Sequence, residues 1–217
     1  MEQIEINHLS ENFGKISVLK DISLKYNKGM IYGLIGENGA GKTTLFKCMM
    51  GLYTYTGEIK KAPDIAIGYL PADNFFYTLV TGLEYLQFCI KAKDCKIDYE
   101  KIKTLNGLFN LPLNRYASDY STGMKKKLAL MALLLQENDV YILDEPFNGI
   151  DLKGCIQLKK IIKNLKNEGK TIIISSHLIS SLHEICETIH YLNRHIIYKE
   201  FHEESIEEIE AEIINSL

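Results

Sequence analysis

Hydrophobic and polar residues alternate near the start of the chain, as they do in strands that bury one face. The buried positions of this pattern are Ile4, Ile6, Leu19, Ile22 and Leu24. Residues 30–35 then form a short apolar run that ends at Gly36. Continuous apolar runs are typical of parallel strands that are buried on both faces. The pattern therefore predicts strands with one buried face, followed by a buried parallel strand.

Two further apolar runs lie at residues 140–143 and 171–174, and each ends at polar residues. A segment with helical spacing, residues 154–165, separates them. Strand, helix and strand in this order imply a right-handed parallel crossover. We therefore predict an α/β fold with a mostly parallel sheet and an antiparallel β subdomain at the N-terminus.

Helical spacing of apolar residues replaces the strand pattern between residues 74 and 136. The last segment, residues 203–217, is rich in glutamate and has isoleucines at helical spacing, as in a short surface helix. We expect one domain over residues 1–217. Its parts are an α/β core of 1–73 and 137–202, an inserted helical subdomain of 74–136, and a surface helix of 203–217.

Composition and charge fit an ordinary globular protein, with 46% hydrophobic residues, 24% charged residues and a net charge of -3. Only Arg115 and Arg194 could supply guanidinium contacts, so we do not expect a nucleic acid partner. The five cysteines lack metal-ligand spacing, and we expect them to be reduced thiols. Without a signal peptide or an apolar run of about 20 residues, the chain is expected in the cytoplasm. Any pore would belong to another chain.

Residues 36–44 match the phosphate-binding pattern G-x-x-x-x-G-K-[ST], directly after the buried strand and before a helical stretch predicted at residues 44–50. Glycines let backbone N–H groups turn toward a phosphate, and the dipole of a helix N-terminus favours it. The alternative, a strand-to-helix turn without a ligand, leaves the lysine and the two threonines unexplained. The predicted nucleotide-binding residues are Gly36, Glu37, Asn38, Gly39, Ala40, Gly41, Lys42, Thr43 and Thr44, with Lys42 on the β and γ phosphates and Thr43 on Mg²⁺.

Two adjacent acids, Asp144 and Glu145, follow the apolar run at 140–143. Neighbouring side chains on an extended chain point different ways, and ligands bind at the carboxyl edge of open α/β sheets. We therefore expect Asp144 in the Mg²⁺ shell and Glu145 facing the attacking water as general base. The alternative is a solvated strand end with no chemical role.

With these motifs the sequence resembles the ABC ATPase family, because residues 120–124 lie where that family has its L-S-G-G-Q signature. The resemblance implies that Ser121 and Gly123 contact the γ-phosphate of ATP held by an opposite subunit. Thr122 and Met124 depart from the family pattern. From the residues alone, Ser121 equally fits a helix N-cap, with the lysines at 125–127 on a solvated face.

Two further positions are assigned by the same resemblance. His177 follows the strand at 171–174 and matches the switch histidine, which would hydrogen-bond the γ-phosphate; a structural histidine is the alternative. Phe13 lies where the family stacks a ring on adenine, and an ordinary core phenylalanine is the alternative. Residues 148–151 resemble the loop that crosses the dimer interface.

One loop departs from the family. Where the family has a glutamine after residues 67–71, this sequence has Ala72, and Asp73 is the nearest polar substitute. The departure predicts slower hydrolysis or altered coupling. The aromatic residues 75–77 fit either a docking surface or the core of the helical subdomain.

The resemblance implies an ATPase that needs ATP and Mg²⁺. Its partners would be an integral membrane permease and a second ATPase subunit, identical or paralogous, on the inner face of the membrane. The short chain is more similar to the ATPase subunits of small exporters, such as those of peptide antibiotic resistance and immunity, than to sugar-import ATPases. The alternatives are a soluble ABC ATPase of repair or translation, and a degenerate regulatory cassette that only binds ATP. A GTPase is disfavoured because no N-K-x-D motif is present.

Overall fold

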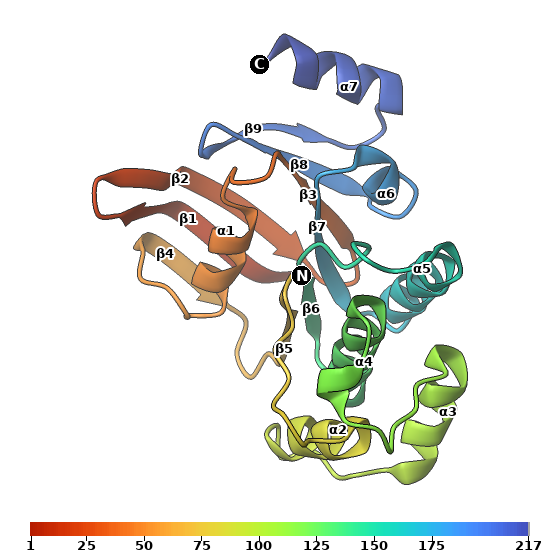
Figure 1. Ribbon diagram of the computed structural model, residues 1–217. Coiled ribbons are helices and arrows are strands. Elements are labelled where there is room, and N and C mark those ends of the chain that lie inside the picture. The colour runs from red at the N-terminus through yellow and green to blue at the C-terminus, as the bar shows by residue number, and fades with distance from the viewer. Residues whose placement is uncertain (217) are drawn as a thin grey trace.

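The computed structural model describes residues 1–216 and contains two β-sheets with helices around them (Figure 1). The smaller sheet has three antiparallel strands in the order β2-β1-β4. These are β1 (Glu2–Phe13), β2 (Ile16–Asn27) and β4 (Thr56–Lys61). The alternating residues of β1 and β2 bury one face, as their pattern predicts.

The larger sheet has six strands in the order β5-β6-β7-β3-β8-β9, all parallel except β9. They are β3 (Ile31–Ile35), β5 (Ile67–Leu70), β6 (Val140–Leu143), β7 (Thr171–Ser176), β8 (Thr188–Asn193) and β9 (Ile196–Phe201). Only β7 separates β3 from β6. The cradle after β3 and the acids after β6 therefore leave the same edge of the sheet close together.

The predicted fold class is confirmed by this mostly parallel sheet, the antiparallel N-terminal sheet and the inserted helices. The helices are α1 (Lys42–Met49), α2 (Gly82–Lys91), α3 (Tyr99–Phe109), α4 (Thr122–Leu135), α5 (Leu152–Asn167), α6 (Ile179–His183) and α7 (Ile206–Asn215), with a short 3₁₀ turn at Ala117–Asp119. None of the helices in residues 1–216 is both long and apolar enough to cross a bilayer. The division into core, insertion and tail stays a prediction.

The six-stranded sheet separates two hydrophobic cores. In β6, Val140 and Ile142 face α1 and the antiparallel sheet, whereas Tyr141 and Leu143 face the core that contains α4 and α5. Helices α2 and α3 share this second core. Apolar side chains on both faces explain why the sequence of β6 is continuously hydrophobic.

The acidic helix α7 lies beyond β9, at the top of Figure 1. Its first turn is closed by a capping box between Ser205 and Glu208. Ile209 is buried against the core, but Ile214 is 67% exposed, so the isoleucines do not all pack inward.

A buried histidine in β8 predicts how stability depends on pH. His190 is 2% exposed and stacks on Tyr32. Burial lowers the pKa of His190 from 6.5 to about 4. The unfolded chain therefore takes up a proton that the folded protein does not, and stability is lost as the pH falls from about 6.5 to about 4. The loss attributable to His190 is about 3 kcal/mol at most.

Urea unfolding near neutral pH and near pH 4 would measure this loss. Other titrating groups also contribute, so the informative quantity is the difference between the native protein and His190→Phe, whose ring keeps the stacking. We expect a shallower pH dependence in the variant. An unchanged pH dependence would show that His190 is not the group responsible.

Candidate functional site

A glycine-rich turn connects β3 to α1, and its backbone conformation explains the sequence. Gly41 is the N-cap of α1 and has a left-handed φ of 114°. A Cβ atom at Gly41 would lie 2.8 Å from the carbonyl oxygen of Val18, so only glycine fits there. Helix α1 begins at Lys42, two residues earlier than the predicted helical stretch. The helix N-terminus therefore lies within the cradle, where it favours an anion.

A cavity of about 290 Å³ lies in front of this turn. It is bounded by the cradle, by one residue of β2 and by two loops that leave the carboxyl edge of the sheet. The lining residues are Val18, Glu37, Asn38, Gly39, Gly41, Lys42, Thr43, Thr44, Ala72, Glu145 and Asn148. The structure thus brings most of the predicted nucleotide-binding residues together with Glu145.

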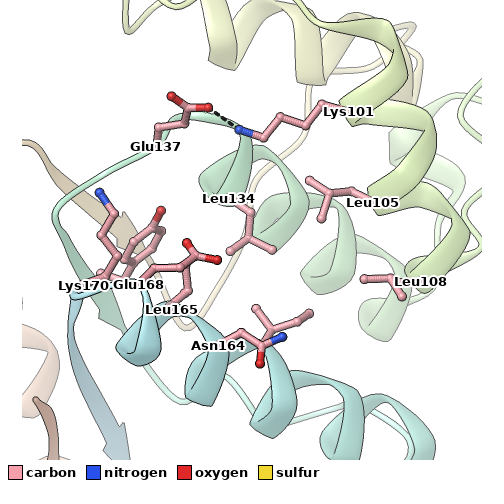
Figure 2. Close-up of a pocket in the computed structure, with 11 residues that line it drawn as sticks. Lys101, Leu105, Leu108, Leu134, Glu137, Asn164, Leu165, Glu168 and Lys170 are labelled. Atoms are coloured by element: carbon pink, nitrogen blue, oxygen red, sulfur yellow. Dashed lines mark hydrogen bonds and ion pairs between the residues drawn. The ribbon is translucent and has the colours of Figure 1, made fainter. Parts of the chain in front are cut away.

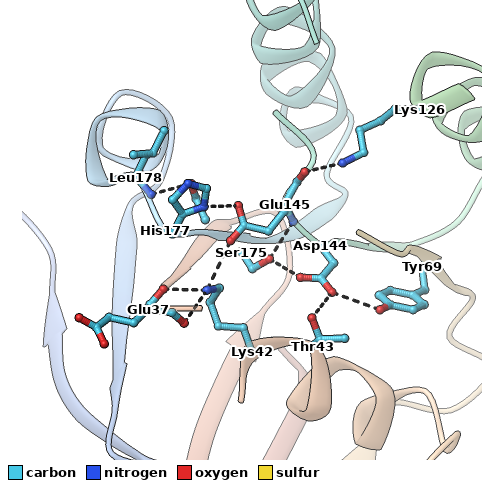
Figure 3. A network of polar contacts seen from close by, with 12 residues as sticks. Glu37, Lys42, Thr43, Tyr69, Lys126, Asp144, Glu145, Ser175, His177 and Leu178 are labelled. Carbon is cyan, nitrogen blue, oxygen red and sulfur yellow. Dashed lines mark hydrogen bonds and ion pairs between the residues drawn. The ribbon is translucent and has the colours of Figure 1, made fainter. Parts of the chain in front are cut away.

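Lys42 is held inside the cradle (Figure 3). Its Nζ donates to the carbonyl oxygens of Gly36 at 2.7 Å and Glu37 at 3.1 Å, and lies 3.4 Å from Oε1 of Glu145. The side chain is only 6% exposed. The ammonium group is therefore held at the cavity by the protein's own oxygen atoms.

Thr43 and Asp144 meet beside the cradle. The Thr43 hydroxyl donates to Oδ2 of Asp144 at 2.6 Å, and Ser175 donates to Oδ1 at 2.6 Å. The Tyr69 hydroxyl lies 3.4 Å from Oδ2. Burial and the Asp144 carboxylate raise the pKa of Tyr69, so its hydroxyl stays protonated as a donor. Asp144 itself is fully buried.

The donors at this point fit Mg²⁺. A hydroxyl and a carboxylate oxygen, both hard ligands, converge from Thr43 and Asp144. No cluster of three or more His, Cys, Asp or Glu side chains that could hold a metal occurs in residues 1–216. This arrangement suits an ion that takes one or two protein ligands and completes its shell with phosphate and water.

Glu145 has an unusual backbone conformation for a non-glycine residue, with φ of 47°. Its N–H donates to the Ser175 hydroxyl at 2.9 Å, and its Oε2 lies 3.0 Å from Nδ1 of His177. The other carboxylate oxygen has no hydrogen-bond partner and faces Lys42. The carboxylate thus lies at the cavity wall, between His177 and Lys42.

The structure does not place every predicted site residue at this cavity. Phe13 ends β1, is 47% exposed and packs edge to face on Tyr53, with ring centres 5.3 Å apart. Ser121 caps α4 by accepting a hydrogen bond from the N–H of Met124 at 3.3 Å. Neither of them lines the cavity, and neither does Gly123. Their predicted roles toward ATP stay predictions.

Three side chains in this network were not predicted from the sequence. Ser175 and Tyr69 both contact Asp144. Lys126 donates to the Glu145 carbonyl at 2.7 Å. The position of Ser175 could have been predicted from the strand pairing. In the parallel register Leu143 pairs with Ile174, so Ser175 is level with Asp144 on the next strand. The expectation that the lysines at 125–127 form a solvated face is wrong for Lys126, which is 4% exposed.

The loop after β5 contains Ala72 at the position where the family has a glutamine. Ala72 lines the cavity, whereas Asp73 is exposed and does not line it. Asp73 therefore does not replace the family's glutamine in this conformation. Among the aromatic residues that follow, Phe76 is buried, and Phe75 and Tyr77 are exposed.

A second cavity, of about 420 Å³, lies between α3, α4 and α5 (Figure 2). Its floor is apolar, formed by residues such as Leu105, Leu134 and Leu165, and an ion pair of Lys101 with Glu137 lies at its rim. None of the predicted site residues lines it.

A glycine-rich loop with its lysine and threonine, beside an acidic pair at the end of the next strand but one, defines a P-loop protein that binds nucleoside triphosphates. Residues 19–148 match the model of the ABC transporter family. The chain belongs to this family, whose ATP-binding subunits are ATPases that power transport. The resemblance inferred from the sequence is thereby confirmed.

Several relatives carry descriptive names. The bacitracin transport ATP-binding protein BcrA of Enterococcus faecalis is 34% identical over 86% of this chain, and the chain spans 65% of that relative's length. The lantibiotic transport ATP-binding protein SrtF of Streptococcus pyogenes is 30% identical, with 95% of both chains covered. A solved ATP-binding subunit of an ABC transporter shares the fold, with a TM-score of 0.87 at 24% identity over 98% of this chain and 99% of that chain.

Proposed function

We propose that this chain binds and hydrolyses ATP as the motor subunit of an ABC exporter. The observation that carries the proposal is that Lys42, Thr43 and Glu145 line one cavity. Asp144 and His177 lie directly behind it, in contact with Thr43 and Glu145 respectively. These groups are the parts that phosphoryl transfer to water requires: a phosphate anchor, a metal site and a base.

Each residue has a distinct task in the proposed reaction. Lys42 and the N-terminus of α1 bind the β and γ phosphates, and Lys42 exchanges its contact with Glu145 for the phosphate oxygens. Thr43 and Asp144 hold Mg²⁺, which offsets phosphate charge when bound. Glu145 accepts a proton from the attacking water, and His177 orients the Glu145 carboxylate through the 3.0 Å contact. The same histidine is placed to contact the γ-phosphate.

We further propose that two such subunits enclose the ATP. Ser121 is exposed at the start of α4 and lies outside the cavity of its own chain, which is consistent with contact to ATP on a second subunit. Gly123 lies in the first turn of the same helix, where a phosphate would be favoured by the dipole. The second subunit is an identical copy or a paralogue.

Closure of the pair would move a separate integral membrane permease, with this chain on the cytoplasmic face of the membrane. Phe75 is 78% exposed and Tyr77 is 67% exposed in the loop between β5 and α2, which supports a docking surface there. The transport names of the bacitracin and lantibiotic relatives support a role in transport. Export is the direction that we propose.

Purification of the tagged chain from detergent-solubilised membranes of its native cell tests this role. We expect a polytopic membrane protein to copurify in a stoichiometric amount, and mass spectrometry would identify it. A fully soluble protein with ribosomal or DNA-bound companions would instead support the soluble ABC ATPases, and the transport role would be wrong.

One observation favours a second candidate, a cassette that binds ATP for regulation only. Ala72 presents a methyl group to the cavity where the family has a glutamine, and this substitution removes a polar contact to the metal and water. Steady-state phosphate release by the purified protein separates the two candidates. Release above the rate of a Glu145→Gln variant supports the motor, and equal rates support the regulatory cassette.

A further inference from the structure

Lys126 is a buried lysine that no recognised motif explains. It lies in the second turn of α4, is 4% exposed, and donates from Nζ to the Glu145 carbonyl oxygen at 2.7 Å (Figure 3). Burial lowers the pKa of Lys126, so the site disfavours the charged ammonium group. Buried ionic groups serve a specific structural or functional role in some proteins, which makes Lys126 a candidate for such a role.

The hydrogen bond falls on the residue whose orientation matters most. Glu145 has its left-handed φ of 47°, and both of its backbone polar groups are bound by side chains from other elements. Ser175 of β7 accepts from the N–H at 2.9 Å, and Lys126 of α4 donates to the carbonyl oxygen. The N–H of Asn148 also donates to this oxygen at 3.2 Å. The peptide geometry that directs the Glu145 carboxylate is therefore fixed partly by α4.

Helix α4 contacts the segment after Glu145 at two further points. A Cβ atom on Gly123 would lie 2.7 Å from the carbonyl oxygen of Gly149, so the two backbones touch. Lys127 forms an ion pair with Asp151 at 2.8 Å. The start of α4 and residues 145–151 therefore form one contact surface within a single chain.

We propose that Lys126 is a positioning residue that couples the start of α4 to the orientation of Glu145 in the same chain. The inference rests on the proposed function, in which Ser121 and Gly123 at the start of α4 meet the ATP of the second subunit. Engagement of that ATP then fixes α4, and Lys126 holds the Glu145 backbone in its working geometry. The general base on one chain thereby responds to the nucleotide bound by the other.

A purely structural role for Lys126 predicts a different result on substitution. Methionine has nearly the same length and no charge, and the Glu145 carbonyl oxygen keeps its bond from Asn148. Replacing a buried ammonium group by an apolar chain of similar volume is often neutral or stabilising. If Lys126 served stability, Lys126→Met would melt at a lower temperature. If it positions Glu145, activity falls while stability is kept or rises.

The test compares Lys126→Met, Lys126→Gln and the native protein in thermal melting, in binding of a fluorescent ATP analogue, and in steady-state hydrolysis. We expect Lys126→Met to bind the analogue with native affinity, to melt at the native temperature or above, and to have a kcat about tenfold to a hundredfold lower, the effect of losing a charge-assisted hydrogen bond. Lys126→Gln keeps a donor and should recover part of the kcat. Lys125→Met is the matched control, since the side chain of Lys125 is only partly buried.

Native kcat in Lys126→Met would overturn the inference, and so would parallel losses of melting temperature and analogue binding. Equal losses in Lys126→Met and Lys125→Met would also overturn it, because the effect would then belong to helix charge. A native protein that does not hydrolyse ATP would instead contradict the proposed function. The two failures are therefore distinguishable.

Discussion

Glu145→Gln is expected to abolish turnover while ATP binding is retained or strengthened. In the proposed mechanism the variant loses the carboxylate that accepts a proton from water, and general bases contribute about a hundredfold to ten-thousandfold to catalysis, so hydrolysis should fall by about that range. Binding should not weaken, because Oε1 of Glu145 lies 3.4 Å from Nζ of Lys42 and a neutral amide no longer competes with phosphate for the lysine. Phosphate release and analogue titration measure the two effects.

Glu210→Gln is the matched control for this substitution. Glu210 is exposed on α7, so replacing it removes the same charge far from the cavity. It should hydrolyse ATP as the native protein does. Native turnover in Glu145→Gln would show that Glu145 is not the base, and weaker ATP binding would show that its ion pair with Lys42 supports the cradle.

Lys42→Ala is expected to raise the Kd for ATP about a hundredfold, which corresponds to roughly 3 kcal/mol and matches the loss of a charged donor to phosphate. The structure gives the reason: the Lys42 side chain is 6% exposed, and two carbonyl oxygens hold its ammonium group in the cradle. Little side-chain entropy remains to be lost on binding. Titration with a fluorescent ATP analogue would measure the change.

Lys103→Ala on α3 is the control for Lys42→Ala, since Lys103 is exposed and lies in another part of the chain. Its Kd should equal that of the native protein. If Lys42→Ala bound ATP equally well, the cavity would hold a different ligand, or hold ATP in a different orientation.

The parts of the fold with strong local signals were predicted from the sequence. The apolar run at 140–143 coincides with β6, and the helical spacing at 154–165 lies within α5, because burial on both faces and burial on one stripe leave different patterns. The start of α1 was predicted two residues too late, since its N-cap is a glycine of the cradle rather than a polar residue. Rules for helix starts that look for a polar N-cap side chain therefore miss this helix.

The contacts around Glu145 were less accessible to sequence reasoning. Lys126 and Glu145 are 19 positions apart, and Tyr69 and Asp144 are 75 positions apart. Such pairs follow from the strand order β5-β6-β7 and from the packing of α4 beneath it, and neither leaves a periodic pattern. Because Lys126 is the middle one of three successive lysines, the sequence alone predicts that it is exposed.

The two cores on opposite faces of the six-stranded sheet also bear on how such a protein can diverge. Side chains of α1 pack only with the core that supports the cradle, whereas α2, α3 and α4 pack with the other. Substitutions in α2 and α3 can therefore accumulate without repacking the nucleotide cradle, whereas α4 is tied to Glu145 through Lys126. The sheet thus separates the packing of the nucleotide cradle from the packing of α2 and α3, which would let one nucleotide site be combined with differently shaped helical surfaces.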